Sequence, residues 1–210
     1  FITTSKDSTI FQGPKYKNIS FFMPPVDRGI ECFNIYDLKP QNDLFYAISH
    51  GVNRATLKLG KIDSRIIFIN KLIGKIRDIN YDFYGLGEKE PIWGEEFYTS
   101  LTNSKMGLNL SRGRPTKHYS SNRIATFMGN GLLTFVDTKV KMRTFFKNDE
   151  LITYKDLNDL ADKIKFYLKN DKIRKKIAKK GQQKYFALFN EQKVAKFITD
   201  KSLGKSVNLY

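Results

Sequence analysis

The sequence has very few of the residues that build disulfides or metal clusters. Its 210 residues include one cysteine, Cys32, and two histidines, His50 and His118. A single cysteine excludes a disulfide within the chain and a cysteine-based zinc cluster, and two histidines argue against a histidine-rich metal site. We therefore expect no metal site built on cysteines or histidines, and we predict no bound cofactor.

Long apolar runs are also missing. No stretch approaches the roughly 20 apolar residues that span a bilayer, and no secretory signal is visible at the start. The chain opens on Phe1 in what reads as the middle of a strand, so we expect it to be a piece of a longer protein. We expect a cytoplasmic location without a transmembrane segment, with peripheral association at the inner membrane face left open.

Acidic residues are outnumbered, 21 Asp and Glu against 37 Lys and Arg, which gives a formal net charge of +16. Such an excess attracts nucleic acid, anionic lipid or phosphorylated ligands. Much of it lies in residues 170–184, where Ile173, Ile177, Gly181 and Tyr185 recur every four residues with lysines between them. That pattern favours an amphipathic helix with a solvated basic face over a nucleic-acid site.

Short apolar runs alternate with segments of helical periodicity. Strands are expected in 1–5, 17–27, 42–51, 78–87, 105–111, 131–137 and 150–154, and helices in 63–76, 92–104, 120–130 and 156–170, with two more helices at the end. The alternation predicts an α/β fold, with a Rossmann-like parallel sheet, helices on both faces and a helical C-terminal tail. Ligands of such sheets bind beyond the carboxyl ends of the strands, so the turns after Ser49, Tyr84 and Leu110 matter most.

The turn after Leu110 is rich in hydrogen-bond donors. If Ser120 or Ser121 caps the next helix, its free N–H groups lie beside Arg123 and the loop cations Arg112, Arg114 and Lys117. A helix N-terminus with cationic side chains is an anion site, most naturally for phosphate. The alternative is a solvated surface loop with an ordinary cap. The motif matches neither a Walker A loop nor GxGxxG, and His118 is given no catalytic role.

Two segments carry a family resemblance. "GLNLSRGRPTKHYSSNRIATFMGNGLLTFVD" and the later "FFKNDELITYKDLNDLADKIKFYLKNDKIRKKIAKKGQQKY" resemble the C-terminal domain of GT-B glycosyltransferases, in the group related to the spore-maturation protein CgeB. The shared features are Arg123 opening a helix, Gly131 before an apolar strand, Glu150 before a short strand, and the IAxxG run at 177–181. The resemblance implies the C-terminal half of a GT-B fold.

The resemblance also implies a domain organisation and a donor site. Residues 1–25 would end an N-terminal Rossmann-like domain and its linker, 26–200 would bind a nucleotide sugar, and 201–210 would form a tail. The donor diphosphate would lie on the helix that starts near Ser120, and residues 84–87 would lie near the base. The candidate donor-binding residues are Asn109, Ser111, Arg112, Lys117, Tyr119, Ser120, Ser121 and Arg123, with His50, Gly51 and Arg54 facing the phosphates from the other side.

The implied activity is metal-independent transfer of a hexosyl-type group from a nucleotide-diphosphate sugar to a glycan, lipid-linked or protein acceptor, such as a bacterial surface polysaccharide. The general base of such enzymes usually lies in the N-terminal half, so no catalytic residue is named and this piece is not expected to act alone. Many relatives carry Glu three residues after the arginine, where this chain has Thr126. The alternatives are a non-catalytic glycosyltransferase-like domain or a basic nucleic-acid-binding domain, although no nucleic-acid partner is expected.

Overall fold

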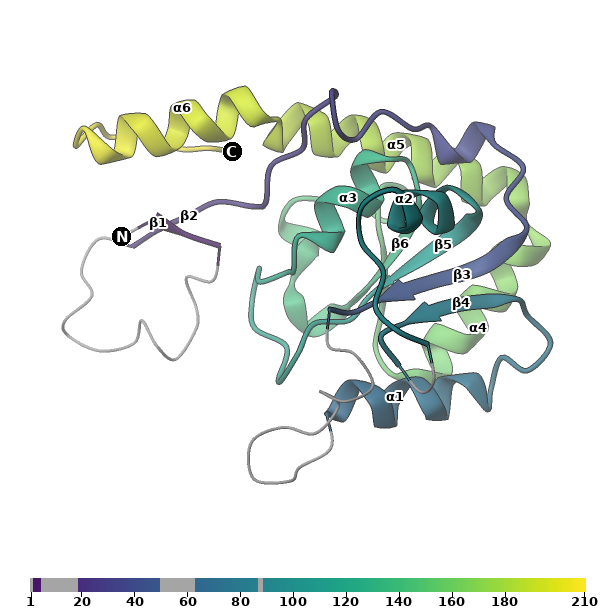
Figure 1. The fold of residues 1–210 in the computed structure, drawn as a ribbon. Helices are drawn as coiled ribbons and strands as arrows, with labels where there is room; N and C mark the ends of the chain where they lie inside the picture. Colours follow the sequence, from purple (N-terminus) through teal and green to yellow (C-terminus); the bar gives the residue numbers. More distant parts are fainter. Residues whose placement is uncertain (1, 5–18, 50–62, 87–88) are drawn as a thin grey trace.

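The computed structural model describes residues 2–4, 19–49, 63–86 and 89–210 and forms an α/β domain with an extended arm (Figure 1). Its main sheet has five strands, and every neighbouring pair is parallel. The strand order is β4 (Tyr81–Tyr84), β3 (Asn42–Ala47), β5 (Ser104–Asn109), β6 (Leu133–Asp137) and β7 (Ile152–Tyr154). The predicted parallel α/β sheet is confirmed.

Alternating side chains of the strands build two buried layers. On one face, Leu44 and Tyr46 of β3 pack with α1 (Ser64–Ile73), α4 (Leu157–Lys169) and the first half of α5 (Asp171–Phe189). On the other face, Phe45 packs with α2 (Gly94–Thr102) and α3 (Arg123–Gly129). This period-2 pattern, apolar on both faces, is what a parallel sheet covered by helices requires.

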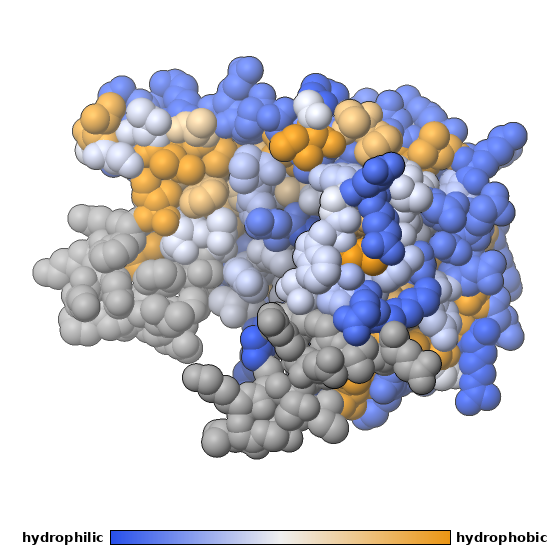
Figure 2. All heavy atoms as spheres, viewed as in Figure 1, coloured by the Kyte–Doolittle hydropathy of each residue, from blue (hydrophilic) through white to orange (hydrophobic). Residues whose placement is uncertain are grey.

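Segments near both ends of the chain form a third buried cluster of apolar side chains. Helix α6 (Glu191–Ser202) continues from α5, and Val26 forms a parallel bridge with Asn190 at their junction. The short strands β1 (Ile2–Thr3) and β2 (Ser20–Phe21) pair with each other in parallel, outside the main sheet. In Figure 2, hydrophilic side chains cover much of the visible face, and apolar ones gather below α6. Among the described residues, no helix is long and apolar enough to cross a membrane.

One predicted detail is right and another is wrong. Gly131 follows the C-cap of α3 with a φ of 73°, as expected of the glycine before β6. Three 3-10 turns lie outside the predicted elements, in Ile35–Asp37, Thr138–Val140 and Met142–Thr144. In α5, Ile173 was expected on the buried face but is 44% exposed, and Arg174 is buried instead. Arg174 is held inside because its guanidinium donates to the Asp171 carboxylate and to the Lys105 carbonyl.

Candidate functional site

The sheet has its switch point between β3 and β5. From β3 the chain first crosses to β4 on one side, and then returns to β5 on the other. The connections therefore leave in opposite directions at the carboxyl ends of β3 and β5, which is where open α/β sheets bind ligands. The loop predicted to bind phosphate follows β5 at this point.

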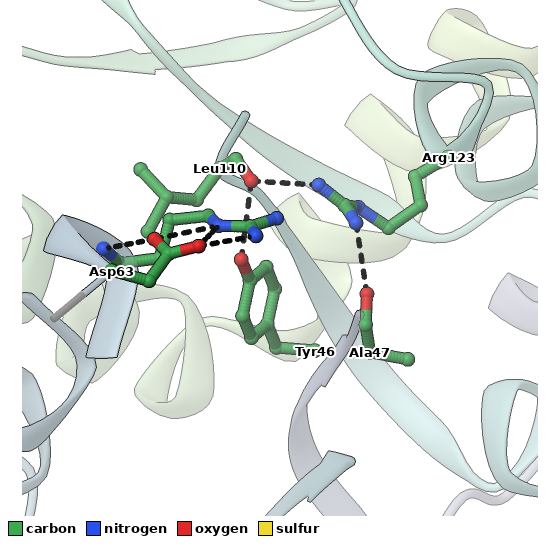
Figure 3. A network of polar contacts seen from close by, with 6 residues as sticks. Tyr46, Ala47, Asp63, Leu110 and Arg123 are labelled. Carbon is green, nitrogen blue, oxygen red and sulfur yellow. Dashed lines mark hydrogen bonds and ion pairs between the residues drawn. The ribbon is translucent and has the colours of Figure 1, made fainter. Parts of the chain in front are cut away.

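Arg123, the first residue of α3, bridges the two strands at the switch point (Figure 3). Its Nη1 donates to the Ala47 carbonyl at 2.9 Å, and its Nη2 donates to the Leu110 carbonyl at 2.6 Å. Burial lowers the pKa of the guanidinium, although an arginine remains protonated. Arg123 therefore ties the carboxyl end of β3 to that of β5, and a direct contact with a diphosphate stays a prediction.

Tyr46 and an ion pair extend this network on the side of α1. The Tyr46 hydroxyl donates to the same Leu110 carbonyl at 3.1 Å (Figure 3). Asp63 caps α1 and binds the Arg65 guanidinium at 2.6 Å, and both side chains are buried. Burial alone would raise the pKa of Asp63, but hydrogen bonds from Arg65 and the charge of Arg112 lower it. The sequence analysis did not identify Asp63 or Arg65, because an aspartate two residues before an arginine looks like an ordinary helix cap.

The two predicted capping serines do not cap α3. Ser120 is buried, and its hydroxyl accepts from Asn109 Nδ2 at 2.6 Å and donates to the Ser121 carbonyl at 3.0 Å. The Ser121 hydroxyl donates to Asn109 Oδ1 at 3.3 Å. The N-cap position belongs to Asn122, which makes no side-chain cap bond. The cap prediction is wrong because Asn109 takes up both hydroxyls and closes the loop onto β5.

The structure separates the predicted loop residues into two groups. Asn109, Ser111 and Tyr119 line a cavity of about 370 Å³ at the carboxyl edge of the sheet. Lys117 lines a different cavity, between β2 and the C-terminal residues. Arg112 lies close enough to Asp63 to affect its pKa, while His50, Gly51 and Arg54 lie outside the described residues. The loop is therefore only in part a wall of the cavity.

His118 has a structural position. Its backbone N–H donates to the Val140 carbonyl at 2.7 Å, and its Nε2 lies 2.9 Å from the Thr144 hydroxyl. Its ring packs against that of Phe145, with centroids 4.8 Å apart. These contacts hold the His118 ring against Thr144 and Phe145.

The remaining walls of the 370 Å³ cavity come from elements that the sequence analysis did not connect with a site. Residues at or after the ends of β6 and β7 and at the start of α1 and α4 contribute Ser64, Arg65, Phe68, Asp137, Lys139, Val140, Tyr154, Lys155, Asp156 and Leu157. Polar residues directly after apolar strands were a visible signal in "TFVD" and "ITYKD". Their convergence depends on β6 pairing with β7, with Asp137 opposite Tyr154.

The described residues contain no group of three His, Cys, Asp or Glu side chains placed to hold a metal ion. Asp137 and Asp156 are the two carboxylates of the cavity lining, and each caps a backbone turn.

Thr126, which stands where many relatives carry Glu, does not line this cavity. Its hydroxyl donates to the Asn122 carbonyl at 3.5 Å within α3.

Known proteins share this fold. A glycosyltransferase from Rickettsia africae superposes with a TM-score of 0.65 at 11% identity, covering 98% of this chain and 64% of that protein. Sucrose-phosphate synthase from Thermosynechococcus elongatus superposes with a TM-score of 0.62 at 12% identity, covering 97% of this chain and 57% of that protein. An α-glucosyltransferase superposes with a TM-score of 0.64 at 12% identity, covering 95% of this chain and 63% of that protein. The chain thus spans roughly three fifths of these proteins.

Sequence comparison identifies the family to which the chain belongs. No curated protein matches the chain significantly. The family described as "Glycosyl transferase-like" matches residues 65–200, which is more than half of the chain and includes every element from α1 to α5. The fold is thus the one implied by the resemblance to the C-terminal half of GT-B enzymes, and the chain belongs to the glycosyl transferase-like family.

Proposed function

We propose that this chain is the donor-binding half of a glycosyltransferase and that the 370 Å³ cavity receives part of a nucleotide-diphosphate sugar. The observation that carries the proposal is the position of the cavity, at the carboxyl edge of the sheet beside its switch point. Its volume lies near the lower end of the range of about 300–1,000 Å³ for small-molecule sites. The glycosyltransferase-like family membership supports the same ligand class.

The loop wall suits the diphosphate. Ser111 and Thr116 offer hydroxyls there, and Arg65 and Arg112 place positive charge around Asp63. Hydrogen bonds to charged groups contribute about 1.5–3 kcal/mol each, so two or three would give micromolar to millimolar binding. These cations, reduced by the charge of Asp63, would offset part of the phosphate charge without a metal ion. One similar structure is an α-glucosyltransferase in complex with UDP and DNA, and another is T4 phage BGT in complex with UDP and Mn²⁺, which makes a nucleoside diphosphate the first ligand to test.

The proposal extends to the acceptor and the location of the whole enzyme. The transfer would deliver a hexosyl-type group to a glycan, lipid-linked or protein acceptor. A cytoplasmic protein, peripheral at the membrane, is consistent with a donor made in the cytoplasm. The chain covers less than two thirds of its structural relatives, so the acceptor and the catalytic base are assigned to the remaining part of such a protein.

A basic nucleic-acid-binding domain is the competing proposal. It draws on the charge of +16 and predicts exposed aromatic side chains beside exposed cations. Most large aromatic residues of the described part instead lie in the three buried clusters, as Phe45, Tyr46, Phe135 and Tyr185 do. Binding to an oligonucleotide that weakens steeply with salt would favour this alternative.

The test is saturation-transfer NMR of the chain with UDP, GDP, CMP and ADP, with a short oligonucleotide for comparison. Thr116→Trp fills the cavity from a partly exposed loop position, and Thr99→Trp is the matched control on the exposed side of α2. We expect transfer to one nucleotide in the wild type and the control, and its loss in Thr116→Trp. Transfer that survives in Thr116→Trp would exclude this cavity as the donor site.

A further inference from the structure

Tyr154 ends β7 with a hydroxyl that the protein leaves unused. The side chain is 1% exposed and lines the 370 Å³ cavity. Within the described part of the chain, its Oη and Arg123 Nε are the two buried side-chain polar atoms without a hydrogen-bond partner. Buried polar groups are nearly always paired, and an unpaired one costs free energy, so each exception calls for an explanation. Because Tyr154 also lines the cavity, its hydroxyl is the exception that a ligand there could pair.

The hydroxyl is a neutral group in this position. Burial raises the pKa of Tyr154, and the charge of Asp137 raises it further. The phenol can therefore both donate and accept one hydrogen bond, as a sugar hydroxyl can. The ring of Phe68 lies beside it, with centroids 6.2 Å apart, and gives the cavity an apolar surface next to the hydroxyl.

Two carboxylates flank the tyrosine. Asp137 is the register partner of Tyr154 at the end of β6, and its Oδ1 accepts from the Lys139 backbone at 2.8 Å. Asp156 caps α4, and its Oδ1 accepts from the N–H groups of Asn158 and Asp159. In the described part of the structure, both carboxylates accept these bonds through Oδ1. Each Oδ2 can therefore accept a bond from a ligand hydroxyl.

Tyr154, Asp137 and Asp156 form one wall of the cavity, and the charge of this wall disfavours binding of a phosphate group there. Asp137 and Asp156 stand against two exposed lysines, Lys139 and Lys155, and the α4 N-terminus is already neutralised by Asp156. On the opposite side, Arg65 is the cation of the lining, and the loop after β5 contributes the hydroxyls of Ser111, Thr116 and Tyr119. A ligand with one anionic and one neutral, hydroxyl-rich end would match this division.

We propose that the wall made by Tyr154, Asp137 and Asp156 holds the glycosyl group of the donor and that the Tyr154 hydroxyl bonds one of its hydroxyls. The inference rests on the proposed function and adds which residues select the sugar. A site built to hydrogen-bond a hydroxyl discriminates strongly against a ligand that lacks it. Tyr154 and Asp137 are thus specificity-determining residues.

The test compares nucleoside diphosphates with their sugar conjugates by titration calorimetry of the chain. The probes are UDP, GDP and ADP beside UDP-glucose, UDP-galactose, UDP-N-acetylglucosamine, GDP-mannose and ADP-glucose. We expect the wild type to bind at least one conjugate more tightly than its parent diphosphate. In Tyr154→Phe that conjugate should bind about five- to tenfold more weakly, while the parent diphosphate stays within about twofold.

Two further variants sharpen the comparison. Asp137→Asn keeps an oxygen for the Lys139 backbone but loses the charge, and it should weaken the same conjugate. Tyr81→Phe removes an exposed hydroxyl at the amino end of β4 and should change neither affinity.

Each other outcome overturns a defined claim. Equal weakening of diphosphate and conjugate in Tyr154→Phe would place the nucleotide, rather than the sugar, at this wall. Unchanged affinities, or no conjugate tighter than its parent in the wild type, would remove the assignment of the sugar and leave the proposed function standing. Binding of none of the eight probes to the folded wild type would remove the proposed function itself, and this inference with it.

Discussion

Arg123 and Tyr46 donate hydrogen bonds to the same carbonyl oxygen, that of Leu110. The guanidinium carbon of Arg123 also lies 5.2 Å from the centroid of the Tyr46 ring. Two residues 77 positions apart (123 − 46) thus hold the strand end from which the candidate donor loop departs. The loop position depends on this bridge, because Leu110 is the last residue before the cavity-lining Ser111.

Removing the bridge should destabilise the domain. Arg123→Met keeps most of the length of the side chain but leaves the Ala47 and Leu110 carbonyls without their charged donor. We expect a loss of about 2–4 kcal/mol in the free energy of unfolding, measured with urea, and a smaller loss in Arg123→Lys, which can reach one carbonyl. A Met variant as stable as the wild type would show that the bridge carries little weight. It would also make Arg123 a better candidate for direct phosphate contact.

Two fully buried tyrosines give a matched pair. The Tyr185 hydroxyl donates to the Pro24 carbonyl at 2.8 Å, whereas the Tyr154 hydroxyl has no partner in the described part of the chain. Tyr185→Phe should lower the free energy of unfolding by about 1 kcal/mol, and Tyr154→Phe should leave it unchanged or raise it. The measurement is urea unfolding without ligand. A clear loss of stability in Tyr154→Phe would mean that its hydroxyl already has a partner in the free protein.

Asp63 predicts a pH dependence. Its folded-state pKa lies below the ordinary value of 3.8, because hydrogen bonds from Arg65 outweigh the effect of burial. A lowered pKa stabilises the fold above pH 3.8, and this contribution is lost as the pH falls through the folded-state value. Asp63→Asn should therefore be less stable than the wild type at pH 7, and the difference should shrink below pH 3.8. A difference that stays constant across this range would show that the charge of Asp63 does not matter.

Glycine at 181 is required by packing. A Cβ there would overlap the backbone carbonyl oxygen of Glu150, so α5 can approach the start of β7 only with glycine at this position. We expect Gly181→Ala to lower the free energy of unfolding by about 1–3 kcal/mol. Gly74→Ala is the control, because its Cβ would find ordinary contacts and its backbone is right-handed helical. That change should be neutral or stabilising by about 0.4–1 kcal/mol, and equal effects in urea unfolding would refute the packing account.

Some features of the site were accessible from the sequence. The donor-rich loop after β5 was located because it lies between two apolar runs, and Asn109, Ser111 and Tyr119 do line the cavity. Their partners were not accessible. Ser120 looked like a cap because it precedes a helical pattern, but Asn109, eleven residues earlier, takes its hydroxyl. The distance between such groups is set by how strand, loop and helix pack together.

The sequence by itself determined the succession of strands and helices, the parallel sheet and the place of the donor-rich loop after β5. These follow from apolar periodicity and turn residues, which act over a few positions. Only the tertiary structure decided that Arg123 turns inward to two carbonyls and that Arg174 is buried in place of Ile173. It also brought Asp137 and Tyr154 together at one wall of the cavity. Such choices depend on which distant polar group is left to be satisfied once the core has formed, and no local pattern encodes that.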